Sequence, residues 1–133
     1  MQGISHITFI VKDLGKAKFF FEIIFDAKEV YDSGEQTFSL SREKFFLIGD
    51  LWIAVMEGDV LLERTYNHIA LKISEEEFYL YEKRVKMIGV EYRQPRSRVK
   101  GEGRSLYFYD FDNHLFELHT GTLSERLARY QVK

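Results

Sequence analysis

The sequence predicts an α+β fold built from two similar modules, each with the order strand, helix and further strands (βαβββ). The main observation is an internal repeat, because residues 5–11 resemble residues 67–73, and the helical stretches 18–25 and 80–87 keep the same offset. A second observation is that both matched strands alternate apolar and polar side chains, which is typical of a strand with one buried face. Together they place a strand and a helix at equivalent points of each half.

Composition limits what the protein can be. Of its 133 residues, 45% are hydrophobic and 16% aromatic, which excludes intrinsic disorder. The formal net charge is −2, from 19 basic and 21 acidic residues, so nucleic-acid binding is not expected. There is no apolar run of membrane-spanning length and no secretion signal, so we expect no membrane segment and a cytoplasmic location. The absence of cysteine excludes disulfides and thiolate metal ligands.

The first module is expected to begin with a strand at 4–11, whose odd-numbered positions from residue 7 onward are apolar. Asp13 is a suitable N-cap for a helix that runs to Phe25 with its apolar side chains in one stripe. Further strands should follow at 28–31, 37–40, 45–48 and 51–56.

The second module repeats this order and begins with a strand at 67–73. Ser74, with Glu77 three residues later, forms a capping box. The helix that follows should end at Ile88, because Gly89 is a favourable residue just beyond a helix. Further strands are expected near 90–93, 105–109 and 115–119.

A short helix should close the chain. Thr122, with Glu125 three residues later, forms a second capping box at its start. Its apolar residues recur at helical spacing, so we expect them to face inward. They are Leu123, Leu127 and Tyr130.

Two connecting segments are also interpretable. Asp112 and Asn113 indicate a turn between the last two strands. The stretch 96–104 has no clean periodicity and contains glycines, so we expect a mobile or ligand-facing loop. The whole chain is then one domain, with repeats at about 1–60 and 63–121 followed by the C-terminal helix.

Two histidines and one glutamate are candidate metal ligands. His6 and His68 occupy matching positions in the two repeats, each on the strand face opposite the apolar one. Glu117 lies between Phe116 and Leu118 in a strongly apolar strand, where an unpaired carboxylate would be costly to bury. A metal would resolve that cost, and this ligand set suits Mn, Fe, Ni, Zn or Co. The competing interpretation is that each histidine is an ordinary hydrogen-bonded strand residue.

The two remaining histidines are expected to have lesser roles. His119 shares a strand face with Glu117 and should be structural or support the metal ligands. His114 follows the turn and should be exposed.

The first repeat favours a catalytic metal site over a structural one. Ala54 occupies the position that matches Glu117, so no fourth protein ligand is expected there. Three protein ligands leave coordination positions open for water or substrate. Hydroxyl and basic side chains near the same strands are candidates for binding an anion, although each taken alone is also explained as a solvated surface residue. They are Thr8, Arg98, Lys100, Tyr107 and Arg126.

These residues carry a resemblance to a known family. The paired βαβββ halves with His6, His68 and Glu117 resemble the vicinal oxygen chelate superfamily, which has the glyoxalase-like fold and takes its metal ligands from the first strand of each half and the last strand. Within it, the chain is similar over nearly its full length to the fosfomycin resistance proteins. The segments that carry the similarity are 6–8, 51–52, 66–68, 105–119 and 121–127.

The resemblance implies a Mn²⁺-dependent enzyme that adds water to the epoxide of fosfomycin, with other divalent metals as alternatives. Segment 39–48 is similar to the water-adding members, called the FosX type, in which a glutamate at the position of Glu43 is the general base. From the residues alone, Glu43 between Arg42 and Lys44 would be a solvated charge. The resemblance also implies residues that hold the phosphonate or shape the cavity. They are Thr8, Trp52, Tyr66, Arg98, Tyr107 and Arg126.

The resemblance further implies a strand-swapped homodimer. In such a dimer, His6 of one chain meets His68 and Glu117 of the other in a half-barrel metal cleft. The large number of aromatic residues, 12 Phe and 8 Tyr, is consistent with a large shared interface.

Two alternative functions stay open: a thiol transferase that adds glutathione or bacillithiol to fosfomycin, and a non-catalytic protein that sequesters a small anion. Phe45 stands where glutathione-using members have Tyr, and Gly101 stands where they have Ser in a potassium-binding loop. Thiol transfer and a potassium requirement are therefore not expected. Glu43 argues against both alternatives, because neither needs a base at that position.

Overall fold

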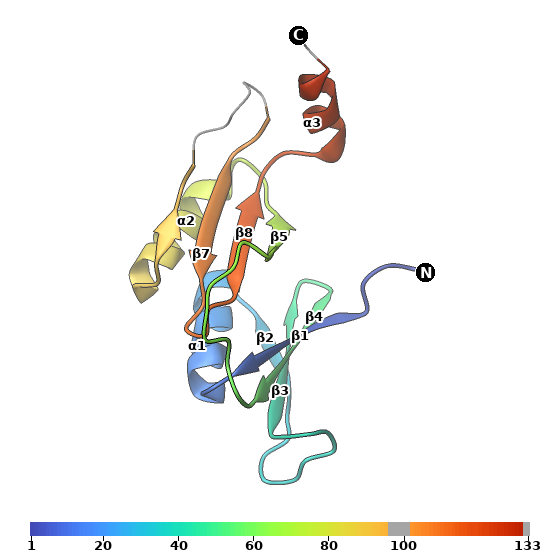
Figure 1. The fold of residues 1–133 in the computed structure, drawn as a ribbon, viewed down its shortest axis with the longest axis vertical. Helices are drawn as coiled ribbons and strands as arrows, with labels where there is room; N and C mark the ends of the chain where they lie inside the picture. The colour runs from blue at the N-terminus through green and yellow to red at the C-terminus, as the bar shows by residue number, and fades with distance from the viewer. Residues whose placement is uncertain (96–101, 132–133) are drawn as a thin grey trace. The chain divides into compact units, whose positions relative to one another are not determined.

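The structure is a computed structural model that describes residues 1–95 and 102–131. It divides into two compact units (Figure 1). The first holds residues 1–64 and 110–114, and the second holds the described residues of 65–109 and 115–133. Each unit is described by itself.

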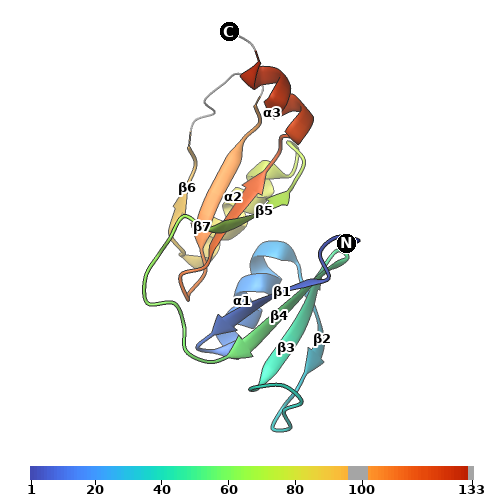
Figure 2. The ribbon, with the colours of Figure 1, turned by 45° about the vertical axis from the view of Figure 1, so that its right-hand side comes forward.

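The first unit is a four-stranded sheet with one helix on it (Figure 2). The strand order is β1-β4-β3-β2, with β1 parallel to β4 and the other neighbours antiparallel. Helix α1 begins after Asp13, whose side chain accepts a hydrogen bond from the Lys16 amide, and ends at Asp26, which has a left-handed backbone. The elements are β1 (His6–Val11), α1 (Leu14–Phe25), β2 (Lys28–Asp32), β3 (Glu43–Ile48) and β4 (Leu51–Glu57).

The core of the first unit lies between α1 and one face of this sheet. Phe21 of α1 stacks on Phe46 of β3, with ring centroids 5.7 Å apart, and also contacts Phe9 of β1. Phe46 is completely buried, and the side chains of Ile53 and Val55 of β4 are at most 1% exposed. The opposite face of the sheet is therefore left for other side chains.

The second unit has the same strand order. Its sheet runs β5-β8-β7-β6, with β5 parallel to β8. The hydrogen bonds of the predicted capping box are present between Ser74 and Glu77, but α2 begins only after Glu77, which is its N-cap. The helix ends at Gly89 with φ +76°, as predicted. The elements are β5 (His68–Lys72), α2 (Phe78–Ile88), β6 (Tyr92–Arg93), β7 (Ser105–Tyr109), β8 (Leu115–His119) and α3 (Leu123–Tyr130). The repeat limits of about 1–60 and 63–121 stay a prediction.

The turn between β7 and β8 belongs to the first unit. Phe111 lies against Phe20, and His114 lies against Phe9 with ring centroids 4.9 Å apart. The carboxylate of Asp110 accepts a hydrogen bond from the backbone amide of His114, and it also lies 2.7 Å from Nδ1 of the His114 ring. The expectation that His114 is exposed was wrong, because this pairing and the Phe9 ring partly cover it. Asn113 confirms the predicted turn with φ +70°.

Two predictions about apolar segments were wrong. Residues 37–40 form no strand: they lie in the loop that connects β2 to β3, and these two strands pair directly with each other. Phe38 and Leu40 are 82% and 96% exposed. The apolar residues of α3 do not face inward, since α3 buries none of its side chains in this chain. Helical spacing of apolar residues predicts a stripe but does not say what covers it.

No described helix combines the length and hydropathy needed to cross a membrane.

Replacing Phe46 with alanine should lower the free energy of unfolding by about 3–5 kcal/mol, because the buried ring leaves a cavity against Phe21. Urea denaturation would measure this. Phe38→Ala is the matched control and should change stability by no more than about 0.5 kcal/mol, because its ring is exposed. Equal losses for the two variants would contradict the assignment of the core.

Candidate active site

One face of the first sheet carries four of the predicted site residues. Strand alternation puts His6 and Thr8 of β1 on the face opposite α1. Trp52 of β4 is paired with His6 in the register, and the two rings stack with centroids 4.1 Å apart. The indole also meets Phe45 of β3 edge-on, at 5.1 Å. Glu43 shares this face, two positions before Phe45.

Glu43 is buried, with 8% of its surface exposed. Its backbone is fixed by Ser33, whose hydroxyl accepts from the Glu43 amide and whose own amide donates to the Glu43 carbonyl, both at 3.0 Å. Within residues 1–95 and 102–131, no hydrogen bond or ion pair engages its carboxylate. A buried and unpaired carboxylate is costly, and such groups are typical of functional sites.

The basic neighbours of Glu43 are engaged elsewhere. The Lys44 ammonium lies 2.8 Å from carboxylate oxygens of both Glu29 and Asp32, and its hydrogen bond holds the pKa of the Asp32 carboxyl below its usual value. Arg42 lies 4.0 Å from Glu57. The interpretation of Glu43 as a solvated charge was wrong, because its side chain is buried, and the basic residues beside it in the sequence pair with other carboxylates.

Trp52 also carries an unsatisfied polar group. Its Nε1 atom is buried and has no acceptor among the residues that the structure describes. Buried donors are normally paired, so an unpaired one next to the His6 ring suggests a missing acceptor.

In the second unit, His68 and Glu117 form a close pair. Nε2 of His68 lies 3.0 Å from Oε1 of Glu117, and Nδ1 lies 2.7 Å from the carbonyl oxygen of Tyr66. A carbonyl oxygen can only accept a hydrogen bond, so Nδ1 of His68 carries a proton and donates it to the Tyr66 carbonyl. In the neutral ring, Nε2 then has a lone pair that faces the Glu117 carboxylate. A divalent cation that binds both of these atoms would satisfy this arrangement. The pair therefore fits a divalent metal, with the second histidine nitrogen oriented by a backbone carbonyl.

Two tyrosines border this pair. The hydroxyls of Tyr66 and Tyr107 are 3.2 Å apart, and both rings contact His68. Burial raises the pKa of the Tyr107 hydroxyl well above its ordinary value, and the Tyr66 hydroxyl and the Glu117 charge add to this effect. Tyr107 is therefore a stable O–H donor at neutral pH.

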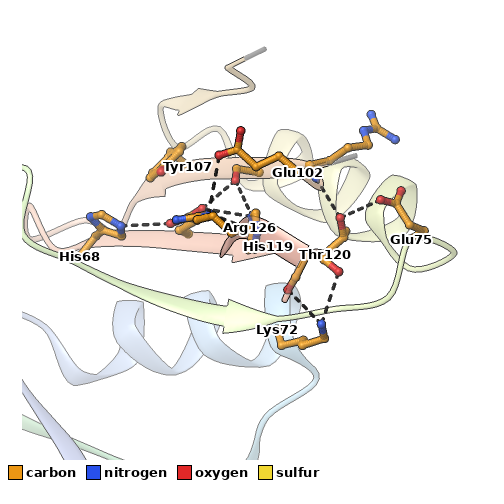
Figure 3. Close-up of polar contacts among 12 residues, drawn as sticks. His68, Lys72, Glu75, Glu102, Tyr107, His119, Thr120 and Arg126 are labelled. Carbon is orange, nitrogen blue, oxygen red and sulfur yellow. Dashed lines mark hydrogen bonds and ion pairs between the residues drawn. The ribbon is translucent and has the colours of Figure 1, made fainter. Parts of the chain in front are cut away.

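A polar cluster surrounds the other side of Glu117, and Figure 3 labels three of its members, Glu102, His119 and Arg126. Ser105 contacts Oε2 of Glu117 at 2.7 Å and Nδ1 of His119 at 2.8 Å. Arg126 of α3 reaches Nε2 of His119 at 3.3 Å and lies 3.8 Å from the buried carboxylate of Glu102. These side chains and the His68 pair line one cavity of about 420 Å³. Ser105 and Glu102 were missed, although strand alternation with Tyr107 could have indicated Ser105.

The structure thus gathers the predicted residues into two groups, one in each unit. Within the described ranges, no cluster of three or more His, Asp or Glu side chains could hold a metal. Arg98, Lys100 and Gly101 lie outside the described residues. The first group is His6, Thr8, Glu43 and Trp52, and the second is Tyr66, His68, Tyr107, Glu117 and Arg126.

Comparison with known proteins agrees with this architecture. A family model described as the Glyoxalase/Bleomycin resistance protein/Dioxygenase superfamily matches residues 3–118. The chain is 65% identical to the fosfomycin resistance protein FosX of Listeria innocua over 98% of both chains. It is 61% identical to FosX of Mesorhizobium japonicum, covering 97% of this chain and 93% of that protein. The metallothiol transferase FosB of Shouchella clausii is more distant, at 38% identity, covering 98% and 88%.

Solved structures give the same result. A mutant of FosX from Listeria monocytogenes, complexed with Mn(II) and 1S,2S-dihydroxypropylphosphonic acid, superposes with a TM-score of 0.88 at 60% identity, covering 98% of this chain and 99% of that one. FosX from Mesorhizobium loti gives 0.86 at 58% identity, covering 97% and 99%. The predicted fold class is confirmed. The chain belongs to the glyoxalase superfamily and, within it, to the FosX-type fosfomycin resistance proteins.

Proposed function

We propose that the protein is a Mn²⁺-dependent hydrolase that opens the epoxide of fosfomycin with water. The FosX structure complexed with Mn(II) and 1S,2S-dihydroxypropylphosphonic acid supports this proposal. That ligand carries hydroxyl groups on adjacent carbons, as the addition of one water to the oxirane of a propylphosphonate requires. The named FosX relatives, at 61–65% identity, are fosfomycin resistance proteins.

The observation that carries the proposal is the buried carboxylate of Glu43. It shares a sheet face with His6 and Thr8, and no described residue neutralises it. Water is a poor nucleophile at neutral pH, so its addition needs a positioned base. A thiol transferase or a sequestering protein has no use for such a group, and burying it without a role would be costly.

His6, His68 and Glu117 would hold the metal. The facing acceptors Nε2 of His68 and Oε1 of Glu117 fit a divalent cation, and His6 offers a third donor of the same class. When bound, the metal supplies a Lewis acid that stabilises the negative charge on the oxirane oxygen as the ring opens.

The residues of the chain perform the remaining steps. Glu43 takes a proton from the water as its oxygen bonds to an oxirane carbon, and the carbon–oxygen bond of the ring breaks with its electron pair left on the ring oxygen. Tyr107 and Arg126 donate hydrogen bonds to the phosphonate, together with Thr8. Three further residues complete the pocket: Arg98 as another phosphonate donor, and Trp52 and Tyr66 as its walls.

Phosphorus NMR of fosfomycin with the protein and Mn²⁺, with and without added thiol, tests this proposal. We expect the resonance of the diol without thiol and no further product with it. A thioether formed only when glutathione or bacillithiol is added would select the transferase instead. Binding of fosfomycin without turnover would select the sequestering protein. The half-buried Phe45 ring, packed between Tyr31 and Trp52, supplies no hydroxyl for a thiol to contact.

The proposed metal site also implies a homodimer. The second unit supplies two ligands, His68 and Glu117, and His6 belongs to the first unit. We propose that the strands swap between chains, so that His6 of one chain completes the site of the other. Light scattering at micromolar concentration should give twice the mass of the chain.

A mixing experiment tests the sharing of ligands directly. His6→Ala and His68→Ala chains should each be inactive. Refolded together, they should recover about a quarter of the parent activity, because half of the dimers are mixed and each has one intact site. Ligands drawn from a single chain would give no recovery, which would exclude the swapped site.

A further inference from the structure

Apart from Arg126, the polar cluster behind Glu117 has no part in the reaction described above. Ser105, His119 and Arg126 form a continuous series of contacts from α3 to the Oε2 atom of Glu117. Glu117 is 5% exposed and its other oxygen, Oε1, faces His68. This series of contacts therefore ends on Oε2, the oxygen of Glu117 that does not face His68.

The direction of every hydrogen bond in this series is fixed by its two ends. A guanidinium can only donate, so Nε2 of His119 accepts from Arg126. An ionised carboxylate can only accept, so the Ser105 hydroxyl donates its one proton to Glu117. The remaining contact, between Ser105 Oγ and His119 Nδ1 at 2.8 Å, must then carry the proton of Nδ1. Nδ1 also lies 3.5 Å from Oε2 of Glu117, where a proton is favourable and a lone pair is not.

We propose that Ser105 and His119 are positioning residues that form a hydrogen-bond relay from Arg126 to Oε2 of Glu117. Each hydrogen bond in the relay donates toward Glu117. The relay occupies Oε2 and so leaves Oε1 as the atom that binds the metal. This inference rests on the proposed metal site. The relay requires Nδ1 of His119 to donate and Nε2 to accept. It connects the arginine proposed to bind the phosphonate with the carboxylate proposed to bind the metal.

The far end of the relay is anchored. The carboxylate of Glu102, 5% exposed, accepts from the Tyr130 hydroxyl at 3.3 Å and lies 3.8 Å from Nε of Arg126. Gly121 lets the chain of residue 102 pass close by, because a Cβ at residue 121 would lie 2.4 Å from the Glu102 carbonyl oxygen. The side chain of Arg126 is thus held on two sides, by Glu102 and by His119.

Substitutions at Ser105 and His119 should change Mn²⁺ affinity according to the hydrogen bond that they remove. Loss of a residue that orients a metal ligand commonly weakens metal binding about 10–100-fold. We expect a loss of about that size in Ser105→Ala, and near-parent affinity in Ser105→Thr, which keeps the hydroxyl. Ser124→Ala, on the exposed surface of α3, is the matched control and should bind Mn²⁺ as the parent does.

Two substitutions of His119 separate its two nitrogens. Asparagine can place an N–H group near the position of Nδ1, whereas glutamine can place an acceptor near the position of Nε2 but offers Ser105 no donor. His119→Asn should therefore keep more Mn²⁺ affinity than His119→Gln. The reverse order would contradict the direction of the relay.

The closing experiment needs neither metal nor substrate. Long-range ¹H–¹⁵N NMR of the metal-free protein distinguishes the tautomers of a histidine ring, and the His119 signals are assigned with His119→Gln. We expect the proton on Nδ1 and a lone pair on Nε2; the opposite tautomer would overturn the relay. Calorimetric titration with Mn²⁺ alone then completes the test. Absence of Mn²⁺ binding in the parent protein would contradict the proposed function, and parent affinity in Ser105→Ala would contradict only the relay.

Discussion

Replacing Glu43 with glutamine is expected to lower kcat for fosfomycin hydration about 10²–10⁴-fold, the usual contribution of a positioned base. Glutamine keeps the shape of the side chain but cannot accept the proton of the attacking water. Arg42 and Lys44 cannot replace it, because both are protonated and engaged with carboxylates of other residues. Turnover is measured by phosphorus NMR at saturating Mn²⁺ and fosfomycin.

Binding measurements show whether such a loss belongs to the chemical step. Calorimetry should give Mn²⁺ and fosfomycin affinities for Glu43→Gln close to those of the parent. Glu35→Gln, an exposed substitution in the loop before β3, is the matched control and should leave kcat unchanged. Hydration at the parent rate in Glu43→Gln would show that another group is the base.

Removing the imidazole of His68 is expected to abolish Mn²⁺-dependent hydration and bound Mn²⁺ together. In His68→Ala, the carboxylate of Glu117 loses the partner that lies 3.0 Å away, and the site loses one of its three proposed donors. Glu117→Gln should weaken Mn²⁺ binding as well, because an amide keeps the shape and loses the charge. Metal analysis after gel filtration and NMR turnover measure the two effects on the same samples.

Two comparisons make this test specific. Glu76→Gln removes an exposed carboxylate in the turn before α2 and should retain the metal content of the parent. His119→Ala should still take up Mn²⁺ at saturating concentration, although with the weaker affinity expected of a residue behind the ligand. Full Mn²⁺ occupancy in His68→Ala would place the metal site elsewhere in the chain.

Strand alternation was enough to predict much of the candidate site. Side chains two positions apart share a face, so the sequence alone puts His6 with Thr8 and puts Glu117 with His119. Capping signals worked for the same reason, because the hydrogen bonds of Ser74 and Glu77 join residues close in the chain. Both signals are local.

Contacts between distant segments could not be predicted in this way. From the residues alone Glu43 was assigned as a solvated charge, but Lys44 pairs with Glu29 and Asp32 of another strand, and Glu43 itself is buried. The contact of Ser105 with Glu117 depends on the register between β7 and β8, in which residue 107 faces residue 117. Neither the partner of a charge nor the register of a hairpin is specified by a single stretch of sequence.

The turn at residues 110–114 has a consequence for biosynthesis. A ribosome makes residues 1–64 first, yet the core they form is completed by Phe111 against Phe20 and His114 against Phe9. These contacts join residues far apart in the chain, so the entropy of closing a long loop must be overcome before they form. The N-terminal unit therefore cannot finish folding during translation until almost the whole chain has emerged. Until then, the Phe9 and Phe20 rings offer apolar surface to chaperones or to other nascent chains.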